Sequence, residues 1–239
     1  MNPVANRQTA MTGKRTMEQF HIRVDAAHSV SALLQAPPRA SVCLVLAHGA
    51  GAGMAHPFMA AVTDGLAARR IATLRYQFPY MEQGSKRPDR PPLAQSTVRA
   101  AVAEARKRCP KLPILGGGKS FGGRMTSQAQ AEEPLDDVRG LIFFGFPLHA
   151  AGKPSDQRGT HLSEIAVPML FLHGSRDQLA DLSLLEPLIR KLGRKASLHV
   201  IPDADHSFHV PARSGRRDTD VMAELLDTVA AWAVKLAAA

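Results

Sequence analysis

The most informative stretch of the 239-residue sequence reads Leu112-Pro-Ile-Leu-Gly-Gly-Gly-Lys-Ser-Phe-Gly-Gly-Arg124. Its residues 118–122 fit the pattern G-x-S-x-G, in which a buried strand turns abruptly into a helix. The serine at such a bend has a strained backbone that lifts its hydroxyl above the sheet. Glycine is needed on both sides because a Cβ there would strike the turn or the neighbouring strand. The stretch therefore predicts a strand, a sharp turn at Ser120 and a helix.

Segments of strand and helix character alternate on both sides of this stretch. Nearly continuous apolar runs, typical of strands buried on both faces of a parallel sheet, occupy residues 41–48, 71–76, 138–145, 168–173 and 196–201. Apolar residues at helical spacing lie between and after them, at residues 57–70, 98–109, 122–132, 182–192 and 221–236. Two shorter runs, 20–24 and 31–34, predict a leading hairpin. We expect an α/β fold with a doubly wound, mostly parallel sheet and helices on both faces.

Length and a hydrophobic content of 45% suit one α/β domain with a large core. We expect this domain to span residues 18–239 and to follow a disordered tail at residues 1–17, which lack the apolar segment of a secretion signal. The proline-rich segment 78–92 is expected to have no regular structure. Every apolar run is far shorter than the roughly 18 residues that span a bilayer, so we expect no membrane partner.

Composition argues against several other function classes. Thirty Lys and Arg against 21 Asp and Glu give a net charge of +9. The basic residues are dispersed and carry no interleaved aromatics, which favours a solvated surface and predicts no nucleic-acid partner. Cys43 and Cys109 form neither a metal-binding pattern nor a disulfide framework. We therefore expect two reduced thiols, no metal and a cytoplasmic location.

Candidate catalytic residues follow the ends of three predicted strands, where function gathers in such sheets. A serine hydroxyl needs a base, and the base needs an acid that holds its tautomer and stabilises the imidazolium. We predict that Ser120 is the nucleophile, Asp177 the acid and His206 the base. Asp181 is the alternative acid and His209 the alternative base.

The order serine, aspartate, histidine along the chain is that of the α/β-hydrolases. With the serine turn, His48-Gly49, His173-Gly-x-x-Asp177 and Asp205-His206-Ser-Phe, residues 20–237 resemble this superfamily, and most closely its small dienelactone-hydrolase-like members. Dienelactone hydrolases proper use a cysteine nucleophile, so the serine here argues against that particular activity. The connection 146–167, where larger relatives insert a lid domain, is short, which predicts a lidless enzyme with an open cleft.

The resemblance implies an oxyanion hole formed by two backbone N–H groups. One is that of Phe121, which follows the serine, and the other is that of Ala50, which follows His48-Gly49. Gly51 is the alternative to Ala50, and His48 is interpreted as a structural residue that holds the turn. Side-chain identity at positions 50 and 121 is then weakly constrained, because the donors belong to the backbone.

Four residues are candidates for substrate binding: Gly51, Tyr76, Phe78 and Tyr80. For the three aromatic residues, packing in the core or in a loop is the alternative. The basic residues of loop 80–90, which are Lys86, Arg87 and Arg90, would favour small or anionic substrates if the loop overhangs the cleft, and a solvated loop is the alternative. The sequence suggests no role for Lys119.

These residues together predict hydrolysis of a small ester or thioester through an acyl-enzyme intermediate, without a cofactor. The alternative is a non-enzymatic binding module on the same fold, since a fold does not determine function. A complete set of nucleophile, base and acid favours the enzyme. The acyl group, the leaving group and the oligomeric state are not encoded in any of these motifs.

Overall fold

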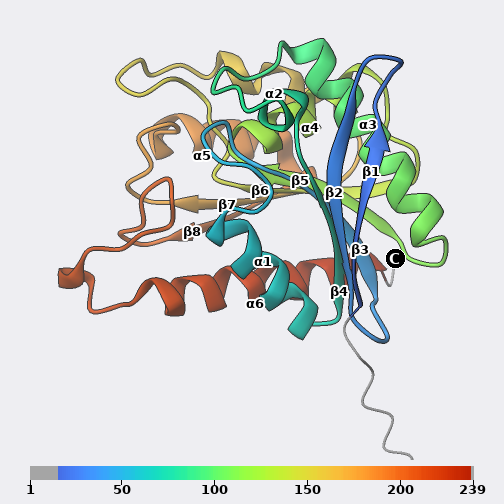
Figure 1. Cartoon of the computed structure of the whole chain (residues 1–239). Helices are drawn as coiled ribbons and strands as arrows, with labels where there is room; N and C mark the ends of the chain where they lie inside the picture. Colours follow the sequence, from blue (N-terminus) through green and yellow to red (C-terminus); the bar gives the residue numbers. More distant parts are fainter. Residues whose placement is uncertain (1–15, 238–239) are drawn as a thin grey trace, which may run out of the picture.

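The computed structural model describes residues 16–237, which form an eight-stranded sheet between two layers of helices (Figure 1). The strand order is β1-β2-β4-β3-β5-β6-β7-β8. The strands are β1 (Thr16–Arg23), β2 (Ser29–Ala36), β3 (Val42–Ala47), β4 (Ile71–Tyr76), β5 (Ile114–Lys119), β6 (Val138–Phe144), β7 (Met169–Gly174) and β8 (Ala196–Ile201). Strand β2 pairs antiparallel with β1 and β4, and all other neighbours are parallel. The predicted doubly wound, mostly parallel sheet is confirmed.

Helices cover both faces of the sheet. In Figure 1, α1 (Pro57–Ala68) and α6 (Asp218–Ala237) lie on one face, and α3 (Pro91–Arg108), α4 (Phe121–Glu132) and α5 (Leu182–Leu192) lie on the other. Each face has its own apolar core, and alternate residues of β3, such as Leu44 and Val45, belong to different cores. Since side chains along a strand alternate between faces, a strand covered on both sides must be apolar throughout.

Two segments differ from the sequence-based expectation. Residues 1–15 of the predicted tail lie outside the described residues, but its last two residues already belong to β1. The proline-rich segment contains the short helix α2 (Pro79–Glu82), and α3 begins at Pro91. Both helices have proline in their first turn, where its missing N–H has no intrahelical acceptor and its fixed φ suits a helix. These prolines begin helices rather than preventing them.

The connection between β6 and β7 is compact. It contains the 3-10 helix η1 (Gln157–Glu164) and no inserted domain, so residues 16–237 include no lid domain. Two further short 3-10 helices are η2 (Gly193–Lys195) and η3 (Ala212–Ser214).

Each half of the sheet comes from one continuous part of the chain. Strands β1 to β4 lie on one side of the sheet and β5 to β8 on the other, and the halves meet where β3 pairs with β5. The β3–β4 connection passes through α1 on one face, whereas the β4–β5 connection passes through α3 on the opposite face (Figure 1). The β3–β5 boundary is therefore a topological switch point, the place where open α/β sheets bind ligands.

Glycines allow close packing on both sides of β5. A Cβ at Gly117 would lie 2.1 Å from the carbonyl oxygen of Ile142 on β6. A Cβ at Gly122, in the first turn of α4, would lie 2.5 Å from the carbonyl oxygen of His48. The glycine-rich stretch thus brings the start of α4 directly against the end of β3.

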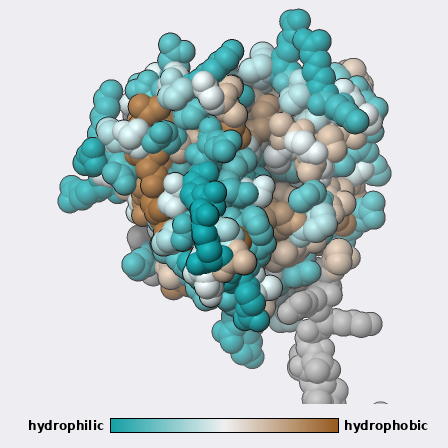
Figure 2. Space-filling model, turned by 90° about the vertical axis from the view of Figure 1, so that its left-hand side faces the viewer, coloured by the Kyte–Doolittle hydropathy of each residue, from teal (hydrophilic) through white to brown (hydrophobic). Residues whose placement is uncertain are grey.

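Hydrophilic residues cover most of the face shown in Figure 2, with smaller hydrophobic areas between them. Among the described residues, the exposed large hydrophobic side chains are those of Met17 and Val234. Between residues 16 and 237, no helix combines the length and the apolar character needed to cross a membrane.

Candidate active site

Ser120 lies at the bend between β5 and α4 and has φ 51° and ψ −115°. Residues other than glycine rarely adopt this conformation. The N–H of Ser120 donates to the carbonyl of Phe144 on β6 at 3.1 Å, and its carbonyl accepts the N–H of Arg124 at 3.1 Å. Hydrogen bonds on both sides therefore hold the bend and fix the hydroxyl at the end of β5.

His206 lies between Ser120 and Asp177. Its Nε2 is 2.9 Å from Oγ of Ser120, and its Nδ1 is 2.7 Å from Oδ2 of Asp177. Since an ionised carboxylate only accepts hydrogen bonds, Nδ1 carries the proton and Nε2 is free to accept the serine O–H. Three residues that follow β5, β7 and β8 thus meet, with the histidine between the serine and the aspartate as the sequence predicts.

Asp177 is 5% exposed, and its Oδ1 accepts the N–H of Leu179 at 2.8 Å. Burial alone would raise the pKa of this carboxyl, but the hydrogen bond and charge of His206 outweigh it and hold the pKa below its ordinary value. Nδ1 of buried His173 lies 3.7 Å from the same carboxylate. Asp177 is therefore ionised at neutral pH and can stabilise a positive imidazole.

The two alternative residues have other partners. Asp181 caps α5, where its carboxylate accepts the N–H of Ser183 at 2.8 Å. His209 is exposed, and its Nδ1 lies 2.8 Å from Oδ2 of Asp218. The geometry favours Asp177 and His206 over them.

A second serine and histidine also lie in contact. Oγ of Ser127 is 2.8 Å from Nε2 of His161, but Ser127 is buried inside α4 and its hydroxyl also donates to the carbonyl of Arg124. Burial and the nearby Arg124 charge lower the pKa of His161 to about 4. An imidazole with so low a pKa, next to a fully buried hydroxyl, is a poor catalytic base.

The loop after β3 is fixed from its core side. Nδ1 of His48 lies 2.8 Å from the carbonyl oxygen of Gly49, and the Tyr80 hydroxyl donates to the carbonyls of Ala50 at 2.9 Å and Gly49 at 3.3 Å. Because C=O and N–H point in opposite directions across a trans peptide, the N–H groups of Ala50 and Gly51 face away from Tyr80.

The N–H of Phe121 is the first of helix α4, and the first N–H groups of a helix have no intrahelical acceptor. Phe121 also directly follows Ser120. Its N–H therefore lies next to the serine and has no acceptor within the helix.

Ser120 and His206 open into a cavity of about 460 Å³ at the β3–β5 boundary. The loop after β3, the start of α1 and the residues next to the serine, aspartate and histidine form its wall, which is mostly apolar. The lining residues are Gly49, Ala50, Gly51, Ala52, His56, Phe58, Met59, Lys119, Ser120, Leu179, His206 and Ser207.

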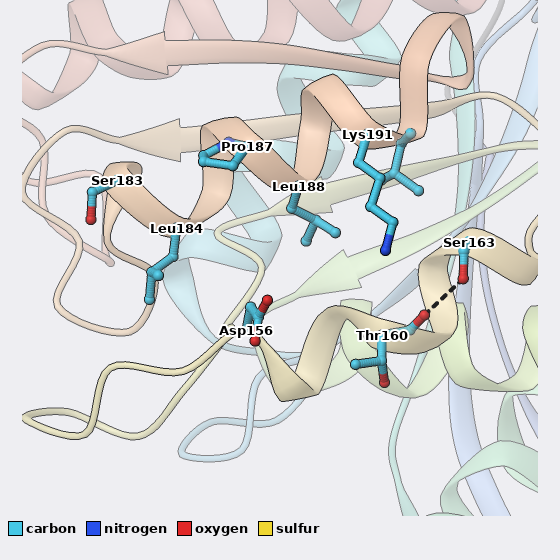
Figure 3. A pocket seen from close by; sticks show the side chains of 9 residues that line it. Asp156, Thr160, Ser163, Ser183, Leu184, Pro187, Leu188 and Lys191 are labelled. Atoms are coloured by element: carbon cyan, nitrogen blue, oxygen red, sulfur yellow. Dashed lines mark hydrogen bonds between the residues drawn. The ribbon is translucent and has the colours of Figure 1, made fainter.

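Another cavity, of about 210 Å³, lies between η1 and α5 (Figure 3). Asp156 and Thr160 from one side face Leu184, Pro187 and Leu188 from the other. No histidine is among its lining residues, so it offers no base for a serine.

Of the four predicted substrate-binding residues, Gly51 lines the cavity and the three aromatic residues do not. Tyr76, Phe78 and Tyr80 are 0%, 0% and 2% exposed and belong to the core on the α3–α5 face. Phe78 packs edge-on against Phe121, with ring centroids 5.2 Å apart. The prediction that these aromatic side chains line the pocket is wrong, because they fill the core behind the loop rather than the cleft.

The basic loop does not reach the cavity either. Lys86 and Arg87 are exposed, Arg90 precedes α3, and none of them lines the site. No contact in the structure supports the expected effect of these charges on substrate choice.

Several lining residues escaped the sequence-based prediction. Phe58 and Met59 open α1, and Leu179 and Ser207 follow the acid and the base closely. For Leu179 and Ser207, the proximity in sequence to Asp177 and His206 is the signal that could have identified them. Lys119, which had no predicted role, also lines the cavity.

Within residues 16–237, no group of three or more His, Cys, Asp or Glu side chains is arranged so that it could hold a metal ion. Cys43 and Cys109 are free and buried.

A doubly wound sheet with a strained serine between a buried strand and a helix, beside a histidine and an aspartate from later strand ends, has the features of the α/β-hydrolase fold. The family model described as an alpha/beta hydrolase domain matches residues 40–234. The chain belongs to this family.

Solved structures share the fold. Dienelactone hydrolase from Anabaena variabilis is 20% identical, with a TM-score of 0.73 over 91% of this chain and 96% of that one. XC6422 from Xanthomonas campestris, described as an α/β serine hydrolase without a lid, is 19% identical, with a TM-score of 0.70 over 97% and 98%. Est1E from Butyrivibrio proteoclasticus, solved with bound ferulic acid, is 18% identical, with a TM-score of 0.66 over 88% and 99%. The resemblance to lidless, dienelactone-hydrolase-like proteins is confirmed.

Proposed function

We propose that this protein is a serine hydrolase that cleaves a small ester or thioester through an acyl-enzyme, with residues 16–237 acting as one catalytic domain. The observation that carries the proposal is the position of His206, 2.9 Å from the Ser120 hydroxyl and 2.7 Å from the Asp177 carboxylate. Membership of the α/β-hydrolase family and the likeness to XC6422, described as an α/β serine hydrolase without a lid, support it.

In the proposed reaction, Oγ of Ser120 attacks the carbonyl carbon of the substrate while its proton passes to Nε2 of His206. The carbonyl oxygen becomes an oxyanion and accepts the N–H groups of Phe121 and Ala50, with Gly51 as the alternative to Ala50. Removing one such donor typically costs about 2.7–4 kcal/mol of activation free energy. Collapse of the intermediate breaks the bond to the leaving alcohol or thiol, which takes the proton from His206.

Water then hydrolyses the acyl-enzyme by the same kind of steps. It transfers a proton to His206, attacks the acyl carbon and releases the acid, and Ser120 recovers its proton. Throughout, the carboxylate of Asp177 keeps Nδ1 protonated and stabilises the transient imidazolium. The lowered pKa of Asp177 suits this role, because the carboxylate stays negative while the imidazole holds the proton taken from the serine.

The cavity supports a small, largely apolar substrate. Its volume of about 460 Å³ is in the range typical of small-molecule sites, and Phe58, Met59 and Leu179 contribute apolar walls. Since no lid domain is inserted between β6 and β7, substrates can enter without the movement of such a domain.

A fluorophosphonate probe tests the proposal because it labels only an activated serine. We expect labelling of the folded wild type at Ser120, found by peptide mass spectrometry, and none in Ser120→Ala or His206→Gln. Ser127→Ala, which removes the other serine in contact with a histidine, serves as the matched control and should label like wild type. A panel of p-nitrophenyl esters of increasing chain length then measures acyl preference. If the folded wild type is not labelled, the binding-module interpretation takes the place of the enzyme.

A further inference from the structure

Lys119 is the last residue of β5 and immediately precedes Ser120. Its side chain leaves the serine turn beside Gly49, where a Cβ on the glycine would lie 3.6 Å from Cγ of the lysine. At its far end, Nζ donates a hydrogen bond of 2.6 Å to the backbone carbonyl of His206. One side chain therefore links the strand that carries the serine to the loop that carries the histidine.

The surroundings of the ammonium suit a cation with a fixed position. It lies 5.5 Å from the ring centre of Phe208 and 6.0 Å from that of Phe58, and these two rings are stacked. Burial lowers the pKa of Lys119 to about 8, while the charges of Asp177 and Asp205 oppose the decrease. The group is therefore mostly an ammonium at neutral pH, and its desolvation is offset by specific contacts.

The loop after β8 carries His206. It has no regular structure over residues 202–211, and Asp203 and Phe208 both have positive φ, at 61° and 65°. A base must nevertheless stay within hydrogen-bond reach of its nucleophile, and a displacement of about 1 Å can reduce a rate about 100-fold.

We propose that Lys119 is a positioning residue that holds the backbone of His206, and through it the imidazole, in place beside Ser120. This inference rests on the proposed function for its effect on rate, but the position of His206 can be measured without a substrate. Lys119 acts here through the histidine and does not touch the reacting atoms.

Lys119→Met tests the inference, because methionine has similar length and flexibility but no donor. Lys195→Met is the matched control, since Nζ of Lys195 also donates to backbone carbonyls, those of Ser163 and Ile165, outside the site. For Lys119→Met we expect kcat to fall about 10- to 100-fold, equally for a neutral and an anionic ester, with KM within about twofold of wild type. Lys119→Arg, which keeps a charged donor, should recover part of kcat.

A substrate-binding lysine would behave differently. If Lys119→Met raises KM for the anionic ester alone and leaves kcat unchanged, the lysine binds the substrate and the positioning role is overturned. Should the methionine variant not fold, Lys119→Gln provides the same comparison, because its shorter, uncharged side chain cannot reach the carbonyl.

The second measurement is independent of turnover. The proton on Nδ1 of His206, bound to Asp177, should give a low-field NMR signal in wild type and Lys195→Met. In Lys119→Met we expect this signal to broaden or disappear through faster exchange with water. An unchanged signal would overturn the proposal. If the signal is lost while the wild type hydrolyses no ester, the positioning role stands and the proposed hydrolase function falls.

Discussion

Ser120 has a backbone conformation that a serine adopts only under constraint, with φ 51° and ψ −115°. Such a residue costs roughly 1–3 kcal/mol, whereas glycine tolerates positive φ. We predict that Ser120→Gly abolishes ester hydrolysis and leaves the melting temperature unchanged or raised by a few degrees. Activity assays and calorimetry of the same sample measure both effects.

Ser120→Ala is the control that separates the hydroxyl from the backbone. It removes the nucleophile but keeps a Cβ in the strained position, so it should be as inactive as the glycine variant without its gain in stability. A glycine variant that melts well below the alanine variant would mean that the bend is not strained.

Tyr80 supports the loop after β3 through its hydroxyl, which donates to the carbonyls of Ala50 and Gly49. Tyr80→Phe keeps the ring in the core and removes only this hydroxyl. We predict that kcat falls about 10-fold with little change in KM, because the proposed oxyanion donor loses its fixed orientation. Tyr76→Phe, in the same aromatic cluster, is the control. Equal kcat values in Tyr80→Phe and Tyr76→Phe would show that the Tyr80 hydroxyl does not support the oxyanion hole.

At the level of single residues, the sequence predicts which residues lie at the site better than where their side chains point. Ser120, Asp177 and His206 could be chosen because each follows a strand end and their order along the chain is distinctive. The pattern cannot say where a side chain points. Tyr80 points into the core rather than the cleft, and Lys119 reaches a carbonyl 87 positions away.

Strand β5 shows how one element constrains its neighbours. Gly117 has no room for a methyl group, because a Cβ would meet the Ile142 carbonyl at 2.1 Å and the backbone of β6 would have to move. We predict that Gly117→Ala destabilises the fold by about 1–3 kcal/mol or more, measured from the urea midpoint. Gly51→Ala, where nothing lies within 4 Å of the added Cβ, should unfold at the wild-type midpoint. Equal midpoints for both variants would contradict the packing argument.

Among the elements, the parallel strands were the easiest to predict, because their burial on both faces leaves continuous apolar runs in the sequence. The sequence does not predict helix α2 or the first turns of α3. A proline breaks a helix when it lies inside it but favours a helix when it lies at the first position. The sequence of residues 78–92 does not show which of the two cases applies.

Buried neutral histidines make the stability of the whole molecule depend on pH. Burial lowers the pKa values of His48 and His161 to about 4 and also lowers that of His173. Between pH 6.5 and 4 the unfolded chain binds protons at these residues that the folded chain does not. We therefore predict that the free energy of unfolding decreases as the pH falls through this range, as urea titrations at several pH values would show.

Variants of two histidines provide the comparison. His161→Gln should make the pH dependence shallower, since it removes one group with a lowered pKa. His21→Gln, at an exposed position on β1, should leave the slope unchanged. A stability that is flat from pH 7 to pH 4.5 in the wild type would refute the assignment of buried neutral imidazoles.

The division of the sheet at the β3–β5 boundary makes this chain suitable for splitting into two fragments that reassemble. A cut in the exposed turn at Gly84 would separate β1 to β4, with the loop that carries Ala50, from β5 to β8, with Ser120, Asp177 and His206. Neither fragment holds all the groups of the proposed mechanism. Hydrolysis would then report on non-covalent reassembly of the two fragments through β3 and β5, and its rate would rise with the product of their concentrations until the complex saturates.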